Sequence, residues 1–216
     1  MRRISIAVSA AALGALVVSV SSVAASSGTT TCTDTLAPGT YGHVVVPDGA
    51  VCVTFAGPVR INGGVSVGAG ATFVLGSEDN PAHTATINGG VTATNAANVQ
   101  IHFSTINGGL MVVGGAGPFG GPFGVTFNAI EDNVIHGGTT ISGYTGFWQG
   151  FFRNNVSGSV DYNNNTLVDP DGNEVQTNTI HGNLNCSGND PAPQEGDSGG
   201  MPNNVTGQKT GQCTTV

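Results

Sequence analysis

One five-residue pattern returns along the chain with a regular alternation of apolar and polar positions. It begins as Ile61-Asn-Gly-Gly-Val65, is repeated without change at 87–91, and recurs in weaker copies up to residue 184. The positions four and six after the start of each copy are mostly apolar, and the position between them is mixed. Such alternation is typical of a strand with one buried face. The copies begin at Thr40, Ile61, Ile87, Ile106, Ile135, Val156 and Ile180.

A second strand-like stretch precedes several copies, as at residues 53–55, 99–103 and 125–127. A strand, a glycine corner and another strand every 19 to 29 residues match one coil of a parallel β-helix. A β-sandwich or jelly roll, the alternative, also has short strands and Gly-rich turns. It would not place the same residue types at one register of successive repeats. We therefore predict an all-β parallel β-helix, a single-stranded solenoid of about seven coils.

Glycine stands two positions after the start of every copy, from Gly42 to Gly182. A corner that needs a positive φ would explain this glycine, and so would close approach of the backbones of adjacent coils. The position before the glycine holds asparagine in three copies, so we expect a hydrogen-bond ladder along the axis. His136 and His181 occupy this position in later copies. Two coils separate them by roughly 9–10 Å, too far to share a metal without a third ligand, so we expect structural roles.

The first 25 residues have the features of a secretory signal peptide. Arg2 and Arg3 precede an apolar run over residues 4–20, and small residues follow it. A membrane anchor is the alternative, but the run is near the lower length limit for a bilayer span. We expect a secreted, extracellular protein without membrane insertion after cleavage. Its expected parts are a signal peptide (1–25), an N-terminal cap (26–39), the β-helix (40–190) and a tail pinned by a disulfide (191–216).

The four cysteines of this expected exported chain predict two disulfides. Three pairings are possible. We favour Cys32–Cys52 and Cys186–Cys213 because each pair lies at one end of the repeats. In the chain-entropy model, each disulfide that closes a loop of this length stabilises the fold by roughly 3 kcal/mol.

Charged residues are scarce, at 8% of the chain. Beyond the expected signal peptide the cations are Arg60, Arg153 and Lys209, against 13 acidic residues. Such a surface cannot neutralise a phosphate backbone, which argues against a nucleic-acid partner. The two arginines lie four coils apart at different registers, so they do not form the cationic centre of a β-helix lyase. We predict no catalytic residues and no cofactor.

Hydrolysis of glycosides needs two carboxylates about 5–10 Å apart, and no sequence feature singles out such a pair. Residues 169–174, Asp-Pro-Asp-Gly-Asn-Glu, resemble half of an oxygen-rich cation loop. They lack the spaced ligands of a full EF-hand, and an Asp/Gly turn is the alternative to a Ca²⁺ site. The four acidic residues available for a carboxylate pair are Asp161, Asp169, Asp171 and Glu174.

Aromatic residues concentrate in two of the longer coils. Phe119 and Phe123 belong to a tandem Gly-Pro-Phe-Gly insert, and Tyr144, Phe147 and Trp148 begin an aromatic-rich stretch that ends at residue 152. The two inserts start eight and nine positions into their copies, so we expect them at the same corner of adjacent coils. Exposed rings suit the faces of sugars or a protein partner. Alternatively, these five rings cover an irregular part of the core.

The start of the repeats, the Gly-Gly-Val turns and the C-terminal segment resemble one protein family. The matching residues are Thr35-Leu-Ala-Pro-Gly-Thr40, Val44-Val-Val46 and Gly182-Asn-Leu184 followed by Cys186 and Cys213. The family comprises uncharacterised secreted bacterial right-handed parallel β-helix proteins, within the pectin-lyase-like fold group. The resemblance implies a right-handed helix and transfers no site residues. Many members of the wider group bind or cleave polysaccharides, an analogy from fold alone.

Two functions follow as hypotheses. The first is a secreted non-catalytic protein of the cell envelope or extracellular matrix, which contacts a polysaccharide or a surface protein through the aromatic residues. The second is a carbohydrate-active enzyme, a polysaccharide lyase or hydrolase, on a pectin-lyase-like β-helix. The scarcity of cations favours the first.

Overall fold

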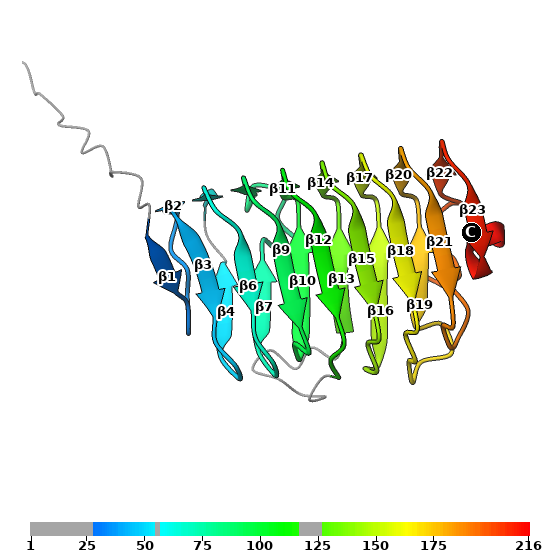
Figure 1. The fold of residues 1–216 in the computed structure, drawn as a ribbon, viewed down its shortest axis with the longest axis horizontal. Helices are drawn as coiled ribbons and strands as arrows, with labels where there is room; N and C mark the ends of the chain where they lie inside the picture. Colours follow the sequence, from blue (N-terminus) through cyan, green and yellow to red (C-terminus); the bar gives the residue numbers. More distant parts are fainter. Residues whose placement is uncertain (1–27, 55–56, 117–126) are drawn as a thin grey trace, which may run out of the picture.

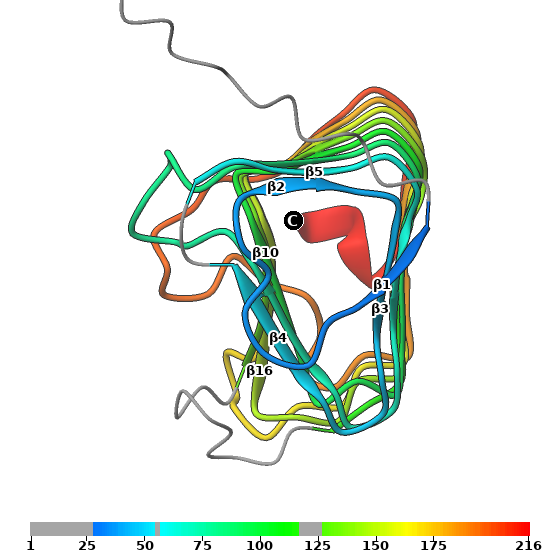
Figure 2. The same cartoon turned by 90° about the vertical axis from the view of Figure 1, so that its left-hand side faces the viewer.

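The computed structural model describes residues 28–54, 57–116 and 127–216, and it shows a rod of parallel strands wound into three sheets (Figure 1). The predicted all-β parallel β-helix of about seven coils is therefore confirmed. Figure 2 views the rod from its N-terminal end, and the chain runs clockwise as it recedes, so the helix is right-handed. The expected signal peptide lies outside the described residues.

Each full coil contributes one strand to each sheet, in the order sheet C, sheet A, sheet B. Sheet A contains β1 (Thr29–Thr31), β3 (His43–Val46), β6 (Val65–Val67), β9 (Val91–Thr94), β12 (Leu110–Val113), β15 (Thr139–Ser142), β18 (Val160–Asn163), β21 (Leu184–Ser187) and β23 (Lys209–Gly211). Sheet B contains β4 (Val51–Thr54), β7 (Thr72–Leu75), β10 (Asn98–His102), β13 (Phe127–Glu131), β16 (Trp148–Phe152) and β19 (Asn173–Gln176). Sheet C contains β2 (Gly39–Tyr41), β5 (Val59–Ile61), β8 (Ala85–Ile87), β11 (Thr105–Ile106), β14 (Val134–Ile135), β17 (Asn155–Val156), β20 (Thr179–Ile180) and β22 (Asn204–Val205).

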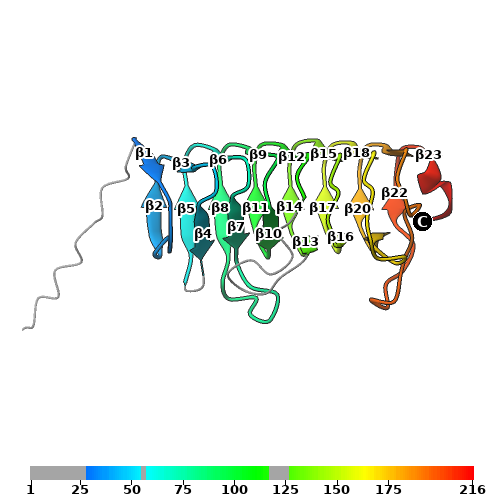
Figure 3. The same ribbon diagram turned by 90° about the horizontal axis from the view of Figure 1, so that it is seen from below.

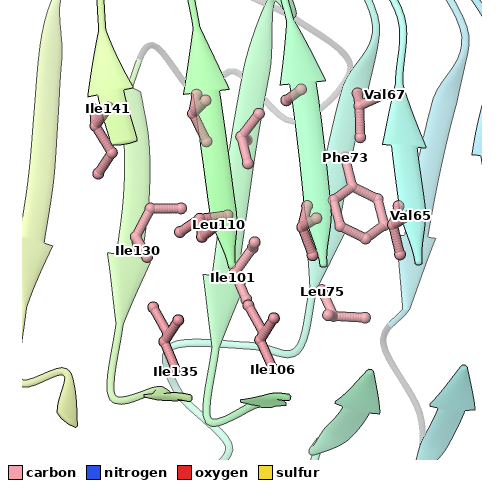
Figure 4. Close-up of a cluster of buried hydrophobic side chains, with 14 of the residues drawn as sticks. Val65, Val67, Phe73, Leu75, Ile101, Ile106, Leu110, Ile130, Ile135 and Ile141 are labelled. Carbon is pink, nitrogen blue, oxygen red and sulfur yellow. The ribbon is translucent and has the colours of Figure 1, made fainter. Parts of the chain in front are cut away.

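The predicted register is confirmed by the pairing in sheet A. The residues four positions into each copy form one buried column, and those six positions in form a second. Figure 4 shows how side chains from all three sheets meet inside the rod, with Leu110 from sheet A, Ile101 from sheet B and Ile106 from sheet C. The first column is Val44, Val65, Val91, Leu110, Thr139, Val160 and Leu184.

Both predicted disulfides, Cys32–Cys52 and Cys186–Cys213, are present, one near each end of the rod. The strands extend beyond residues 40–190, because β1 pairs with β3 while β22 and β23 continue sheets C and A. The last strands belong to an eighth copy of the repeat, with Val205 at its start and Gly207 at its corner. The copy is hard to recognise because Lys209 stands where the others have an apolar residue or threonine. A 3-10 helix, η1 (Gln212–Thr215), follows.

Close approach between coils, and not positive φ, explains the repeated glycine. Gly137 donates its N–H to the carbonyl of Gly108 at 3.1 Å, and Gly108 donates to Gly89 at 3.0 Å. An ideal Cβ on any of these glycines would lie 2.5–3.0 Å from backbone atoms of the preceding coil, a spacing that real Cβ atoms essentially avoid. None of them has a positive φ. The glycines concerned are Gly63, Gly89, Gly108, Gly137, Gly158 and Gly182.

Two kinds of asparagine ladder run along the rod. On the surface, Asn107 donates to Asn88 at 3.1 Å and Asn88 donates to Asn62 at 3.2 Å, which confirms the predicted ladder for these three residues. A second ladder, which the sequence analysis missed, is buried at the corner between sheets B and C. Its side-chain amides bond one another at 2.8–3.1 Å and also satisfy backbone groups. Its members are Asn133, Asn154, Asn178 and Asn203.

The residue before each of the first three asparagines of the buried ladder turns the chain. Asp132, Arg153 and Thr177 have φ values of 58°, 57° and 57°, a region that non-glycine residues rarely adopt. The asparagine side chains bond the backbone on both sides of this turn, which offsets the cost of that conformation. The ladder therefore holds the corner that leads from sheet B to sheet C.

Gly137 and Gly138 form a matched pair for testing the glycine corner. A Cβ at Gly137 would lie 2.7 Å from the carbonyl oxygen of Gly108, whereas one at Gly138 would come only within 3.5 Å of the Ser159 oxygen. Overpacking of this kind costs about 1–3 kcal/mol, so Gly137→Ala should lower the free energy of unfolding by that amount. Gly138→Ala should change it by less than about 0.5 kcal/mol. Equal urea midpoints for the two variants would contradict the close-approach explanation.

Asn154 and Asn155 form a matched pair for the buried ladder. Asn154→Ala removes the acceptor of the Asn133 N–H and the donor to the Ile130 carbonyl. Buried polar groups without a partner cost about 1–3 kcal/mol each, so we expect a loss of roughly 2–5 kcal/mol in the free energy of unfolding. Asn155 is exposed, and Asn155→Ala should be nearly neutral. A small loss from Asn154→Ala in urea unfolding would show that the ladder does not stabilise the fold.

Candidate functional site

The outer face of sheet B carries three columns of side chains along β10, β13, β16 and β19. Strand pairing places each column in register across successive coils. Ala129 and Gly150, the small residues of the middle column, leave space between the outer two. The first column has Phe127 and Trp148; the middle has Gln100, Ala129, Gly150 and Glu174; the third has His102, Glu131, Phe152 and Gln176.

Two loops rise beside this face and lie apart along the axis of the rod. Residues 76–84 form the first loop, between β7 and β8, and residues 188–203 form the second, between β21 and β22. Figures 2 and 3 show both loops projecting on the side of sheet B, the first in teal and the second in orange. The second loop packs closely on the sheet, because Gln194 bridges to Glu174. The face between the loops becomes a groove.

Three aromatic rings meet across this face, Phe127 and Trp148 from the first column and Phe152 from the third. Trp148 meets Phe127 edge to face, with ring centroids 5.5 Å apart, and meets Phe152 in a similar way at 5.8 Å. A Cβ at Gly150 would overlap the rings of both Trp148 and Phe152, so the rings lean over the glycine. The absence of a side chain at Gly150 therefore sets the position of the aromatic surface.

Glu174 lies at the base of the groove with both carboxylate oxygens engaged. The indole N–H of Trp148 donates to Oε1 at 3.1 Å, and the amide of Gln176 donates to Oε2 at 2.7 Å. The side chain is fully buried, in part because residue 196 passes directly over it. The bond from Trp148 fixes the orientation of the indole ring, which is the largest ring in the groove.

A cluster of charged side chains lies next to Phe152. Arg153 stacks on the ring of Phe152, with its guanidinium carbon 4.8 Å from the centroid. It donates to Asp132 through both Nε and Nη2, at 2.8 and 2.7 Å, and to Glu131 at 3.0 Å. Burial raises the pKa of Glu131 to about 7, and the nearby Arg153 opposes only part of this rise. Glu131 is therefore able to gain or lose a proton near neutral pH.

His102 lies one coil before Glu131 in the same column. Only 1% of its surface is exposed, and its Nδ1 atom, 3.9 Å from the Glu131 carboxylate, makes no hydrogen bond within the described part of the chain. Burial lowers the pKa of His102 to about 4, so the ring is neutral near pH 7. A buried ring nitrogen without a partner, next to a carboxylate of raised pKa, marks this end of the groove as a candidate functional site.

The groove encloses a cavity of about 370 Å³, within the range of small-ligand sites. Its lining combines aromatic rings with four carboxyl groups and one guanidinium, and that guanidinium is paired with Glu131 and Asp132. The lining residues are Glu78, Phe127, Glu131, Trp148, Phe152, Arg153, Glu174, Asp197 and Ser198.

The five aromatic candidates have different surroundings. Trp148 lines the groove. Tyr144 is only 1% exposed, so the expectation of an exposed platform was wrong for this ring: it packs into the corner beside residue 146, as the alternative interpretation had it. Phe147 is 38% exposed but does not line the cavity. Phe119 and Phe123 lie outside the described residues.

Most of the groove has no clear signal in the sequence. Residues 148–152 resemble part of an insert, whereas they form β16 in sheet B. Alignment of residues 127–131 with 148–152 in one register would have placed Glu131 and Phe152 in one column. No sequence signal brings Glu78 and Asp197 to the same cavity, because they belong to loops that lie several coils apart in the chain.

The segment considered for Ca²⁺ forms a turn in which the Asp169 carboxylate accepts the N–H of Asp171. Its last residue, Glu174, points into the groove, away from such a loop site. Among the residues that the structure describes, no three His, Cys, Asp or Glu side chains gather closely enough to hold a metal ion. Within the same residues, no helix has the length and apolar character needed to span a membrane.

Comparisons with known proteins found no match to a family model, to a curated protein or to a solved structure.

The pH dependence of stability tests the surroundings of Glu131 and His102. The folded-state pKa of Glu131 is raised from 4.5 to about 7, so its contribution to stability is lost as the pH rises through this interval. That of His102 is lowered from 6.5 to about 4, so its contribution is lost as the pH falls through this interval. These opposite slopes largely cancel between pH 4.5 and 6.5.

Glu131→Gln should remove the contribution of Glu131 to this pH dependence and leave that of His102. The free energy of unfolding of the variant should therefore rise with pH over this interval more steeply than that of the wild type. The double variant Glu131→Gln, His102→Gln should return to the wild-type slope. Urea unfolding at several pH values measures all three. Parallel profiles for the wild type and Glu131→Gln would contradict a raised pKa at Glu131.

Proposed function

We propose that this chain is a secreted, non-catalytic β-helix protein that binds a saccharide in the groove on sheet B. The observation that carries the proposal is the orientation of Trp148. Its ring is fixed between Phe127 and Phe152 and is hydrogen-bonded to a buried carboxylate, inside a cavity walled by two loops. A rigid aromatic ring in a groove provides an apolar surface for a sugar face, with no loss of side-chain freedom on binding.

The other lining residues favour a saccharide as the ligand rather than the flat surface of a protein partner. Carboxylates and the Ser198 hydroxyl accept hydrogen bonds from sugar hydroxyls, next to the apolar rings. A stable protein interface is a broad surface of about 800 Å² on each partner, whereas this groove is a cavity walled by two loops. The groove has the size and mixture of groups that suit one or two sugar residues.

Export of the chain is part of the proposal. Two disulfides near the ends of the rod persist in oxidising compartments, and the N-terminal sequence resembles a secretory signal. We place the protein in the cell envelope or extracellular matrix, in line with its resemblance to uncharacterised secreted bacterial β-helix proteins. In this setting the rod serves as a scaffold and the groove makes the contact.

A carbohydrate-active enzyme is the second candidate, and one observation favours it. Glu131, whose pKa is raised to about 7, and Glu174 line the same cavity. Glycoside hydrolysis uses two carboxyl groups in one cleft, and the one with the raised pKa donates the proton. A reducing-end assay on any saccharide that binds separates the two functions: release of new ends supports the enzyme, and binding without release supports the non-catalytic protein.

Replacement of Trp148 tests the groove as the binding surface. Aromatic contacts contribute about 0.5–1.5 kcal/mol beyond the area that they bury, so Trp148→Ala should weaken saccharide binding about tenfold. Trp148→Phe keeps a ring and should lose less. A glycan array identifies the ligand, and titration calorimetry measures the affinities.

Phe147→Ala is the matched control, because Phe147 is an adjacent exposed ring outside the cavity, and binding should be unchanged. Thermal melting of each variant separates loss of binding from loss of fold. Equal affinities for Trp148→Ala and the wild type, both folded, would place the binding site elsewhere. The absence of any glycan bound by the wild type would refute the proposed function.

A further inference from the structure

We propose that the saccharide bound in this groove carries free amino groups, as in an oligomer of glucosamine. The inference rests on the proposed function and specifies its ligand. Three features support it: an excess of carboxylates in the groove, aromatic faces next to them, and a buried nitrogen beside the groove that has no hydrogen-bond partner among the described residues.

The carboxylates of the groove outnumber its cations. The guanidinium of Arg153 is engaged by Glu131 and Asp132, so its positive charge is already matched by neighbouring carboxyl groups. In the part of the chain that the structure describes, no ion pair involves Glu78, Glu174 or Asp197, the other acidic residues of the lining. Glu174 already accepts hydrogen bonds from Trp148 and Gln176. Glu78 and Asp197 are therefore the exposed carboxylates that a ligand meets. They would repel a sugar acid, and a neutral sugar would not balance their charge. A protonated amine would balance it.

The distribution of cations over the whole rod also favours a positively charged ligand. The chain has a formal net charge of −8. Arg60 is on β5 in sheet C, and Lys209 is on β23 at the C-terminal end. Neither residue lines the groove on sheet B. The field of the protein therefore attracts a cationic ligand to this face and does not depend on a single pair of charges.

The aromatic rings add a contact that suits the same ligand. Phe127, Trp148 and Phe152 form one continuous row beside the carboxylates. The face of an aromatic ring attracts an ammonium group within about 6 Å, and Trp does so most strongly. Phe152 already binds a cation in this way, since the guanidinium of Arg153 lies over its ring. Sugar faces and amino groups are therefore accommodated by the same row.

Nδ1 of His102 has no hydrogen-bond partner among the described residues, and this independently favours a ligand that carries hydrogen-bond donors. Nδ1 of His102 is 3.9 Å from the carboxylate of Glu131, too far for a direct hydrogen bond. Glu131 lines the cavity and His102 does not, so a ligand N–H that reaches Glu131 also comes near Nδ1 of His102. An amino group has several N–H donors, which suits this end of the groove.

A matched pair of ligands tests the inference on the full chain with both disulfides formed. Hexaglucosamine and hexa-N-acetylglucosamine have the same backbone and differ in the charge on nitrogen. At about pH 6, where the free amines are protonated, calorimetry should give hexaglucosamine at least a tenfold higher affinity. Glu78→Gln and Asp197→Asn, which alter exposed loop residues, should each reduce that preference about threefold. Asp34→Asn, an equal change of charge at an exposed residue in the N-terminal part of the rod that does not line the cavity, should not.

Each other outcome has a distinct meaning. Equal affinity for the two hexamers would overturn the amino-sugar inference and leave saccharide binding intact. Binding of neither hexamer, or of any other glycan on an array, would refute the proposed function together with this inference. If hexalysine binds as tightly as hexaglucosamine, the groove recognises positive charge alone, and the assignment to a sugar is wrong.

Discussion

Direct stacking of one coil on the next is the constraint on which the whole structure depends. The coils approach so closely at one corner that only glycine fits, and each glycine N–H bonds the carbonyl of the glycine one coil earlier. This contact holds the register constant from Gly63 to Gly207. Since the register is constant, every inward position repeats, and the apolar columns join into one core along the rod.

The same constraint builds the candidate site. Residues that lie 21 to 29 positions apart in the chain become neighbours because they share a register: His102, Glu131 and Phe152 form one column. The two sheets with short, regular corners vary little from coil to coil. Sheet B differs because the loops beside it vary in length, and two of these loops enclose its outer face. The regularly stacked strands of sheet B form the rigid floor of the groove, and the two loops of irregular length form its walls.

The rigid floor also explains the electrostatics of the groove. Glu131 is held beneath neighbouring side chains by its strand, so it is buried whether or not it is charged, and its pKa rises. Arg153 reaches it only because the chain turns through a left-handed conformation at Asp132 and Arg153 in successive coils. The buried asparagine ladder stabilises that turn, so it also helps to hold Arg153 next to Glu131 in the groove.

The fold was predictable from the sequence because its signals are local and repeated. The glycine corner, the alternation in sheet A and the cysteines at the two ends were enough for the coil count, the register and the disulfides. The groove was not predictable in the same way. Its walls, near Glu78 and Asp197, come from loops without a repeat, and burial of Tyr144 depends on packing at a corner. The buried asparagines repeat two positions before each of the last four copies, but this polar position lies outside the apolar alternation on which the prediction depended.

Trp148 is the chain's one tryptophan, so the emission of the protein reports directly on the groove. Titration with hexaglucosamine, followed by intrinsic fluorescence, tests the central claim that this groove on sheet B is the binding site. We predict a saturable change in intensity or emission wavelength, with the same midpoint as calorimetry. Binding measured by calorimetry without any change in the emission of Trp148 would contradict the account, because the ligand would then occupy another face of the rod.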